Sequence, residues 1–399
     1  MIALHEIATV LRNGKSVRQS SDAGGLPITR IETIADGTIN PTRVGYADLI
    51  ENDAIGWLLQ DGDILISHIN STKHLGKCAI YEGFPEKLVH GMNLLALRVD
   101  QRIAYPKYVH YTLSSAPFRR QLPRITKNSV NQSSFNISSF KKLRLPLPPL
   151  PEQKRIAKIL DAADALRAKR RESLAQLDAL LQSTFLEMFG DPVENPKGWA
   201  VKSLGEIAAR KPNNGIFRKN PAYLDNSQSG LPVVWVGELF RGNEIHVSSS
   251  RRLDVGEKDR EKYGLEFGDI LFCRSSLKLD GIAFNNVYLG KTREALFECH
   301  LIRLSPNQEL VNPRFLNMLL RTSPLRAALK SKAKTATMTT IDQKALMSVQ
   351  VTVPPIDTQK QFSKILDSAE AHRSRLHSQV EELICLSNSL QARAFNGRI

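Results

Sequence analysis

Apolar residues recur at helical spacing over two long stretches of the chain, residues 151–189 and 357–395. In the first stretch they follow alternating steps of three and four residues, which is typical of a coiled coil rather than of a broad globular face. This stripe consists of Leu174, Leu177, Leu181 and Met188, with Thr184 between them. Pro151 suits the first turn of a helix and Gly190 suits its end, so we predict one helix over residues 151–189.

The second stretch has a similar stripe, bounded by a good N-cap residue, Asp357, and by Gly397. The stripe consists of Leu366, Ala369, Leu376, Val380, Leu383 and Leu390. A helix with such a narrow apolar face needs a partner. We predict that the two helices pair with each other, and that they run antiparallel if a pseudo-twofold axis relates the two halves of the chain.

Shorter patterns fill the remaining residues. Gly62–Ile66 joins a turn to a buried β-branched run and predicts a strand. Leu4–Leu11 predicts a short helix, and Tyr105–Leu122 predicts a longer one that begins at Pro106. Lys127–Asn136 is polar and rich in turn-forming residues, which predicts an exposed loop.

The chain contains an internal repeat. Gly62-Asp63-Ile64-Leu65 returns 206 residues later as Gly268-Asp269-Ile270-Leu271, and Pro148-Pro149 returns at the same offset as Pro354-Pro355. Because several matches are collinear, one unit of about 200 residues is present twice.

Each unit therefore joins a strand-rich globular domain to a long helix. The fold class is α+β, with two repeat-related mixed α/β domains separated by two long antiparallel coiled-coil helices. The predicted domains are 1–148, the helix 149–190, 191–352 and the helix 353–399.

The chain is strongly basic, with a net charge of +15. Such a balance favours a polyanionic partner, and the even spread of basic residues favours nucleic acid over a membrane. The sequence has no apolar run long enough to span a bilayer and no secretion signal, so we expect a cytoplasmic protein. The four cysteines form no Cys-x-x-Cys pair and the histidines show no ligand spacing, which argues against a metal site.

Motifs for catalysis are absent from the sequence. Neither a dinucleotide-binding glycine motif nor a phosphate-binding P-loop is present. Glu152-Gln153-Lys154 could suggest a nuclease site, but the repeat copy is Thr358-Gln359-Lys360, without the carboxylate. We therefore expect no enzymatic activity and no cofactor in this chain.

Polar and basic loops occur at equivalent places in the two repeats. Hydroxyl, amide and positively charged side chains can bind phosphates and read base edges, so these loops are candidate DNA contacts. The candidates in the first repeat are Ser67, His68, Asn70, Thr72, Lys73, Arg124, Lys127, Asn128, Asn131 and Gln132. Those in the second repeat are Arg274, Ser275, Ser276, Lys278, Lys330, Lys332, Lys334 and Thr335.

Residues 145–161, Leu-Pro-Leu-Pro-Pro-Leu-Pro-Glu-Gln-Lys-Arg-Ile-Ala-Lys-Ile-Leu-Asp, resemble the conserved region of type I restriction–modification specificity subunits. The copy from Val353 to Asp367 resembles the same region, although Asp357-Thr358-Gln359 replaces Pro-Glu-Gln. The Gly-Asp-Ile-Leu strands and Gly-Leu-Pro segments are similar to parts of that family's target-recognition domains.

The resemblance implies a non-catalytic subunit that reads double-stranded DNA for a phage-defence system. Each recognition domain would bind one half of a bipartite asymmetric site, and the paired helices would set the spacing. The helices would also dock two modification (methyltransferase) subunits, joined by restriction/translocase subunits. S-adenosylmethionine, ATP and Mg2+ would act in those partners. Our docking candidates are the polar helix residues Gln153, Arg167, Arg170, Gln359 and Arg373.

Two other classes of function stay open at this point. A stand-alone DNA-binding regulator would bind its site without partners and would prefer a palindrome. An enzyme with its own methyltransferase or nuclease site would need motifs that the sequence lacks.

Overall fold

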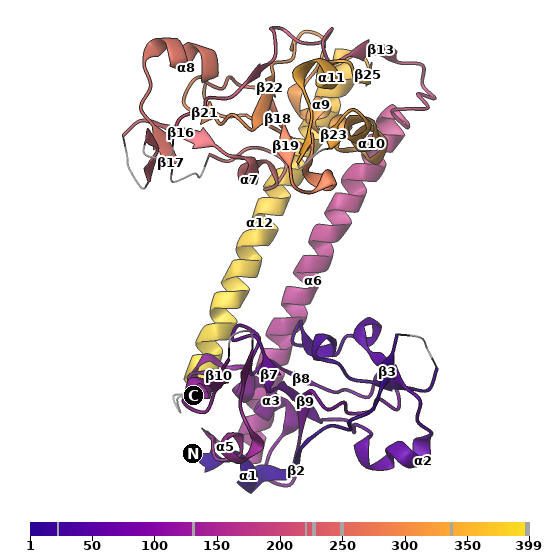
Figure 1. Ribbon diagram of the computed structural model, residues 1–399, viewed down its shortest axis with the longest axis vertical. Helices are drawn as coiled ribbons and strands as arrows, with labels where there is room; N and C mark the ends of the chain where they lie inside the picture. Colours follow the sequence, from indigo (N-terminus) through magenta and orange to yellow (C-terminus); the bar gives the residue numbers. More distant parts are fainter. Residues whose placement is uncertain are drawn as a thin grey trace. The chain divides into compact units, whose positions relative to one another are not determined.

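The computed structural model describes residues 1–21, 24–129, 132–219, 222–225, 229–247, 251–335 and 338–395. The chain forms two compact units: unit 1 comprises Met1–Glu172 and Leu376–Ile399, and unit 2 comprises Ser173–Arg375. The two long helices are α6 (Leu150–Phe189) and α12 (Ile356–Phe395), and each contributes one half to each unit (Figure 1). Both predicted helices are confirmed, and each begins one residue earlier than expected. The predicted domain limits at the helix ends stay a prediction, since the compact units divide within both helices.

Unit 1 is built around a four-stranded antiparallel sheet in the order β2-β9-β6-β8. Its strands are β2 (Ala8–Asn13), β9 (Leu94–Val99), β6 (Ile64–Ser67) and β8 (Cys78–Ile80). The smaller sheets contain β1 (Ile2–Ala3) with β12 (Arg144–Leu145); β3 (Gln19–Ser20), β5 (Gly45–Ala47) and β4 (Leu26–Ile28); and β10 (Lys127–Asn128), β11 (Ser133–Ser134) and β7 (Ile69–Asn70).

Helices cover one face of this main sheet. The helices of unit 1 besides α6 and α12 are α1 (Leu4–Ile7), α2 (Glu51–Ala54), α3 (Pro106–Ser114), α4 (Ala116–Arg119) and α5 (Ile137–Phe140). Tyr108 of α3 is fully buried in a core that also contains Ile156 and Leu160 of α6. Phe395 of α12 belongs to the same core, with its ring centroid 5.6 Å from that of Tyr108. Burial of such side chains contributes about 1.5–3 kcal/mol each, so the long helices are part of the core of unit 1.

Unit 2 repeats this arrangement with a sheet in the order β14-β22-β18-β20. Its strands are β14 (Asn213–Asn214), β22 (Leu301–Leu304), β18 (Ile270–Cys273) and β20 (Asn285–Val287). The other sheets contain β13 (Ala200–Ser203) with β25 (Gln350–Val353); β15 (Leu224–Asp225), β17 (Arg251–Leu253), β16 (Leu231–Val234) and β21 (Leu296–Phe297); and β19 (Ser275–Ser276), β24 (Thr339–Thr340) and β23 (Lys334–Thr335).

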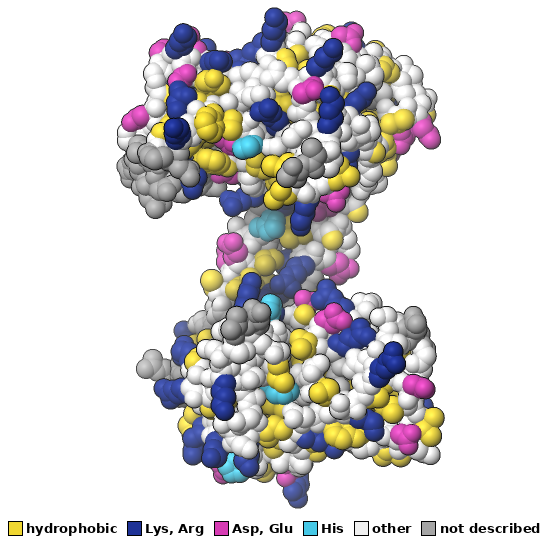
Figure 2. Space-filling view, in the orientation of Figure 1, with side chains coloured by type: hydrophobic (Ala, Val, Ile, Leu, Met, Phe, Trp, Pro, Cys, Tyr) yellow, Lys and Arg dark blue, Asp and Glu magenta, His cyan; other side chains and the backbone are white. Residues whose placement is uncertain are grey.

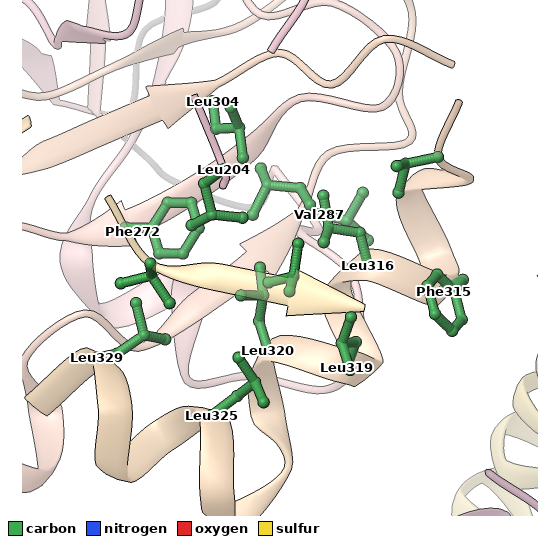
Figure 3. Close-up of a cluster of buried hydrophobic side chains, with 14 of the residues drawn as sticks. Leu204, Phe272, Val287, Leu304, Phe315, Leu316, Leu319, Leu320, Leu325 and Leu329 are labelled. Carbon is green, nitrogen blue, oxygen red and sulfur yellow. The ribbon is translucent and has the colours of Figure 1, made fainter. Parts of the chain in front are cut away.

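The core of unit 2 lies between this main sheet and its helices. The helices are α7 (Val236–Leu239), α8 (Glu257–Tyr263), α9 (Pro313–Arg321), α10 (Ser323–Ser331) and α11 (Gln343–Met347), with the unit's halves of α6 and α12. Figure 3 shows Phe272 and Val287 of the sheet facing leucines of α9 and α10. Phe315 of α9 stacks on Phe185 of α6, with ring centroids 5.9 Å apart. The sheet, α9 and the long helices therefore share one continuous core in this unit.

The repeated Gly-Asp-Ile-Leu segment is a tight turn followed by a central strand. Gly62 and Gly268 have φ values of +88° and +90°, which side chains disfavour. A Cβ at either position would lie 3.1 Å or less from the ring of the proline that begins α3 or α9. The Asp63 and Asp269 carboxylates each accept a backbone hydrogen bond of 2.8 Å from three residues earlier. The motif therefore recurs because it closes the same turn in both units.

The long helices run antiparallel within unit 2. Phe362, near the start of α12, packs on Phe185 and Phe189, near the end of α6. Further along, Arg373 of α12 forms an ion pair with Asp178 of α6. The predicted pairing is confirmed, but the predicted stripe is only partly right. Within it Leu181 is buried and Leu174 is half-buried, whereas Phe185 is buried outside it, because α9 as well as α12 covers this part of α6.

Three shorter predictions need correction. Leu4–Leu11 is a helix only to Ile7 and then continues as β2. Tyr105–Leu122 is interrupted at Ser115, whose hydroxyl caps the next helix, α4. The polar segment 127–136 is no simple loop, because its described residues form β10 and β11, and Ser133 and Phe135 are buried.

Candidate nucleic-acid interface

The candidate DNA-contacting loops of each repeat meet in one small sheet. We call these sheets edge sheet 1 (β7, β11 and β10) and edge sheet 2 (β19, β24 and β23). Each begins directly after the central Gly-Asp-Ile-Leu strand and pairs the same three segments in the same antiparallel sense. Segments about 60 residues apart in the sequence are thereby brought side by side, once in each unit.

In edge sheet 1, hydrogen bonds join the two predicted loops. Thr72 and Ser133 share a hydrogen bond of 2.8 Å between their hydroxyls, and the Ser133 hydroxyl donates to Asn128 Oδ1 at 2.8 Å. Asn70 pairs with Ser133 in the strand register. The exposed candidates on this sheet and its flanks are Thr72, Lys73, Arg124, Lys127, Asn128 and Gln132. Asn131, also predicted, lies outside the described residues.

Two candidates of the first repeat are interior residues. Ser67 is 1% exposed and His68 is 6% exposed. The His68 ring packs edge-on against Phe135, and burial lowers the pKa of this imidazole, which favours its neutral form. A cationic contact between His68 and phosphate is therefore not supported by this conformation. Ser67 instead accepts a 3.1 Å hydrogen bond from the Asn70 amide and so positions the start of the edge sheet.

A cavity of about 590 Å3, lined mostly by polar residues, opens beside edge sheet 1. Ser67, Asn70, His74, Arg30 and Gln19 are among its lining residues. Arg30 is held in place by hydrogen bonds to Gln19 Oε1 at 3.1 Å and to the Ser20 carbonyl at 2.7 Å. A fixed guanidinium and nearby amides suit recognition of base edges or phosphate. Our sequence analysis missed Gln19 and Arg30, because they are far from the loops along the chain.

Edge sheet 2 has the same frame with different side chains. Ser275 pairs with Thr340 and Ser276 with Thr339, and the Thr335 and Thr339 hydroxyls lie 3.1 Å apart. Of the predicted residues here, Arg274, Lys278, Lys332, Lys334 and Thr335 are exposed, whereas Ser275, Ser276 and Lys330 are half-buried. Lys330 forms an ion pair of 2.5 Å with Asp280, so part of its charge is already balanced.

A turn formed by residues 298–301 supports edge sheet 2. The buried Glu298 carboxylate accepts a hydrogen bond of 2.9 Å from the His300 backbone, and His300 Nδ1 lies 2.7 Å from the Ser275 hydroxyl. Burial raises the pKa of Glu298. Ligand atoms of Glu298, Cys299 and His300 lie within 4.8 Å of one another, a grouping that our search for metal spacing missed. Because hydrogen bonds close the turn, we assign this group a structural role.

The cavity beside edge sheet 2 has more aromatic and aliphatic side chains in its lining than that of unit 1. It encloses about 780 Å3, and Phe240, Phe284, Leu277 and Met338 line it together with Ser275. The Phe240 and Phe284 rings stack at 4.6 Å, and Leu277 is 84% exposed between two polar residues. Our sequence analysis did not select Leu277, because its exposure is set by the fold. The two units thus present different chemistry on the same frame.

The predicted docking residues on the long helices fall into two groups. Gln153 and Gln359 are fully buried and form hydrogen bonds inside their own units. Their side chains are therefore not accessible to a partner subunit in this conformation, which argues against the docking role predicted for them. Arg167 contacts Asp164 at 2.9 Å and remains half-buried, and Arg170 is also half-buried. Arg373 contacts Glu370 at 3.3 Å and also pairs with Asp178. Docking by the three arginines stays a prediction.

Basic side chains occur over the visible face of both units (Figure 2). They are interspersed with polar and a few acidic residues, consistent with the net charge of +15. Within the described parts of the chain, no helix combines the length and apolar character that a membrane span requires.

Comparison with known sequences gives a consistent result. A family model described as "Type I restriction modification DNA specificity domain" matches the chain twice, at residues 1–177 and 196–385. The chain is 32% identical over 389 residues to the "putative type I restriction enzyme MjaX specificity subunit" of Methanocaldococcus jannaschii, covering 92% of this chain and 85% of that protein. It is 23% identical over 393 residues to the type I restriction enzyme EcoKI specificity subunit of Escherichia coli K12, covering 94% and 82%.

Two solved structures share the fold. One is the type I restriction–modification S subunit from M. genitalium, with a TM-score of 0.58, 14% identity, and coverage of 99% of this chain and 95% of that chain. The other is a chain from a study of complex assembly and conformational transition of the type I R-M system, with a TM-score of 0.58 and 17% identity, covering 100% and 97%. At these identities the likeness concerns the fold.

Proposed function

Because this chain belongs to the type I restriction–modification DNA specificity family, we propose that it is the non-catalytic DNA-reading subunit of such a complex. Each unit reads one half of a bipartite, asymmetric DNA site through its edge sheet. The antiparallel pair of α6 and α12 sets the spacing between the half-sites.

One observation carries this proposal: the same edge sheet is built twice from different residues. Edge sheet 1 carries Asn128 and Lys127 beside a cavity lined mostly by polar residues. Edge sheet 2 carries Lys334 and Thr335 beside a cavity to which Phe240 and Phe284 contribute. A shared frame supports a shared task, and divergent side chains support two different base sequences. A homodimeric regulator that reads a palindrome would instead present identical surfaces.

The same proposal assigns partners to the long helices. Their outer faces dock two modification subunits, which methylate adenine with S-adenosylmethionine, and restriction subunits that use ATP and Mg2+ join this core. Arg167 and Arg170 are the docking candidates on α6, and Arg373 is the candidate on α12. No cofactor is assigned to this chain itself.

Adenine methylation offers the most direct test. Genomes of cells with and without this chain are sequenced for methylated adenine. We expect one bipartite asymmetric motif to lose methylation when the chain is absent. Loss of no motif, or loss of a palindromic one, would contradict the proposal.

Co-purification separates this function from that of a stand-alone regulator. The tagged chain should retain two methyltransferase chains per copy, and specific DNA binding should require them. Stable specific binding by the isolated chain, without partners, would favour the regulator. Methyl transfer or DNA cleavage by the isolated chain would instead show an enzyme.

A further inference from the structure

The first turn of each long helix is hydrogen-bonded, through one buried glutamine, to the unit in which that helix begins. Gln153 is the fourth residue of α6 and Gln359 is the fourth residue of α12, and both are 0% exposed. A fully buried amide needs hydrogen-bond partners for two N–H donors and one carbonyl oxygen, or its burial is costly. Both side chains have all of these partners, and all of them are backbone atoms of the same unit.

The two sets of hydrogen bonds are equivalent. Gln153 Nε2 donates to the carbonyls of Ile103 at 2.9 Å and Pro148 at 2.8 Å, while its Oε1 accepts from the Tyr105 amide at 2.8 Å. In unit 2, three bonds of the same kind recur. Gln359 Nε2 donates to Leu310 O at 3.1 Å and Pro354 O at 2.7 Å, and Oε1 accepts from Asn312 N at 2.8 Å.

The partners of each glutamine explain what it joins. Tyr105 and Asn312 immediately precede α3 and α9, and Pro148 and Pro354 lie two residues before the long helices. The amide therefore ties the first turn of a long helix to the first turn of the helix that covers the main sheet. Because the proline that begins α3 or α9 also packs on Gly62 or Gly268, this joint lies next to the turn that leads to the edge sheet.

A second contact reinforces the joint in each unit. Lys107 of α3 lies 3.4 Å from the Asp161 carboxylate of α6, and Arg314 of α9 lies 3.1 Å from the Asp367 carboxylate of α12. The side chains of Asp161 and Asp367 are 40% and 54% exposed, so these ion pairs contribute less than the buried amides. They do resist rotation of the long helix about the glutamine.

The sequence around the two glutamines supports a specific role for them. Pro151-Glu152 in the first copy corresponds to Asp357-Thr358 in the second, so the two preceding positions differ. The glutamine is kept in both copies, because glutamate cannot donate and shorter asparagine cannot span the three partners.

We propose that Gln153 and Gln359 are positioning residues, which fix the direction of each long helix relative to its DNA-reading edge sheet. This inference rests on the proposed function, in which the helices set the distance between half-sites. A joint that rotates freely would let one complex accept several spacings. A joint held by three hydrogen bonds restricts the complex to one spacing.

The test compares Gln153→Met and Gln359→Met with Gln361→Met. Methionine has a similar size but leaves the three backbone groups unpaired. Gln361 is an exposed residue of α12, the helix that carries Gln359. The complex of each variant with its modification subunits is titrated with duplexes that carry the correct spacer or one base pair more or fewer. We expect the preference for the correct spacer to fall about tenfold for each buried variant, equivalent to one net hydrogen bond. The base preference at both half-sites should be unchanged in each buried variant. The Gln361→Met complex should keep the spacer preference of the wild-type complex.

Amide hydrogen exchange supplies a readout that does not depend on DNA. Gln153→Met should accelerate exchange at Tyr105, and Gln359→Met should accelerate it at Asn312, each without effect in the other unit. Local acceleration with an unchanged spacer preference would overturn the positioning role and leave the proposed function intact. If the wild-type complex shows no bipartite preference at all, the proposed function itself fails and this inference fails with it. Should a methionine variant not fold, Lys107→Met loosens the same joint from its exposed side and should shift the preference in the same direction.

Discussion

Arg98 holds the buried carboxylate of Asp63 through two hydrogen bonds of 2.7 Å, from Nε to Oδ1 and from Nη2 to Oδ2. In unit 2, the equivalent Asp269 faces Arg210 and Arg303 and accepts a hydrogen bond from Ser305. The repeated turn thus has a buried carboxylate in both units, whereas its cationic partners differ in position. Arg98 lies on β9 and Arg303 on the equivalent strand β22, while Arg210 lies outside the strands. Partner residues that differ in this way show how far the two copies have diverged within one frame.

Replacement of Asp63 by alanine should destabilise unit 1 strongly. Asp63 is 2% exposed but Arg98 is 28% exposed, so the loss of their charge-assisted hydrogen bonds should cost about 1.5–3 kcal/mol. Urea denaturation of the full chain measures the free energy of unfolding. The control is Arg102→Ala, which removes the largely exposed pair with Asp100 and should change stability little. Equal losses for both variants would contradict the importance of the buried pair.

Acid should destabilise unit 1 through His90. This side chain is 1% exposed, and burial lowers the pKa of its imidazole from 6.5 to about 4. Since the unfolded chain binds the proton below pH 6.5 and the folded chain does not, stability falls as pH decreases from 6.5 to about 4, by about 3 kcal/mol in total. Denaturation midpoints measured between pH 7 and pH 4 should therefore decline less steeply for His90→Gln. Replacement of the exposed His372 is the control, and an identical decline in all three proteins would exclude His90 as its cause.

Exposed lysines on the edge sheets should contribute to DNA affinity without base preference. Lys127→Gln or Lys334→Gln should weaken binding of all sequences alike and reduce the slope of log K against log salt concentration by about one, if each lysine neutralises one phosphate. Titrations at several salt concentrations measure both quantities. Lys364→Gln, on α12, is the matched control. An unchanged slope would show that the lysine concerned does not neutralise a phosphate of the bound DNA.

The length of the paired helices should set the spacer. Insertion of four residues after Glu172 and after Arg375 adds about one turn, or about 6 Å, to both helices. The preferred spacer should then grow by about two base pairs, at about 3.4 Å each. Selection from duplexes with randomised spacers measures the change. Insertion into α6 alone would unpair the helices and should reduce binding to every spacer; an unchanged spacer in the double insertion would exclude the helices as its determinant.

Each unit should read its half-site independently. Exchange of residues 200–350 for the corresponding segment of a relative should change one half of the methylated motif and preserve the other half. Methylation mapping of the chimaera reads out both halves at once. The reciprocal exchange, of residues 1–145, should alter only the opposite half. A change in both halves from either exchange would contradict independence.

Periodicity and the internal repeat were sufficient to predict both long helices, their pairing and the duplicated strand after Gly62 and Gly268. These features depend on local spacing and on comparison of the chain with itself. The role of Gln153 could not be predicted in this way, because its partners at Ile103 and Tyr105 are about 50 residues away. Sequence pattern alone presents this residue as a polar position near a helix start.

The recognition surface shows the same limit. The loops around Ser67 and Lys127 were found by composition, yet their union in edge sheet 1 depends on tertiary pairing. Composition also selected His68, which the fold buries against Phe135, and passed over Leu277, which the fold exposes. Exposure in these loops is decided by the packing of neighbouring strands, and no local pattern reports it.

The division of the chain between the units has a consequence for its synthesis. Unit 2 is one continuous segment, Ser173–Arg375, whereas the core of unit 1 includes Leu390 and Phe395 near the end of the chain. A ribosome therefore releases every residue of unit 2 before the last packing residues of unit 1 emerge. Domains usually complete their folding in the order of their synthesis. In this protein the core of unit 1 is complete only after α12 has been synthesised, so unit 1 completes its folding after unit 2.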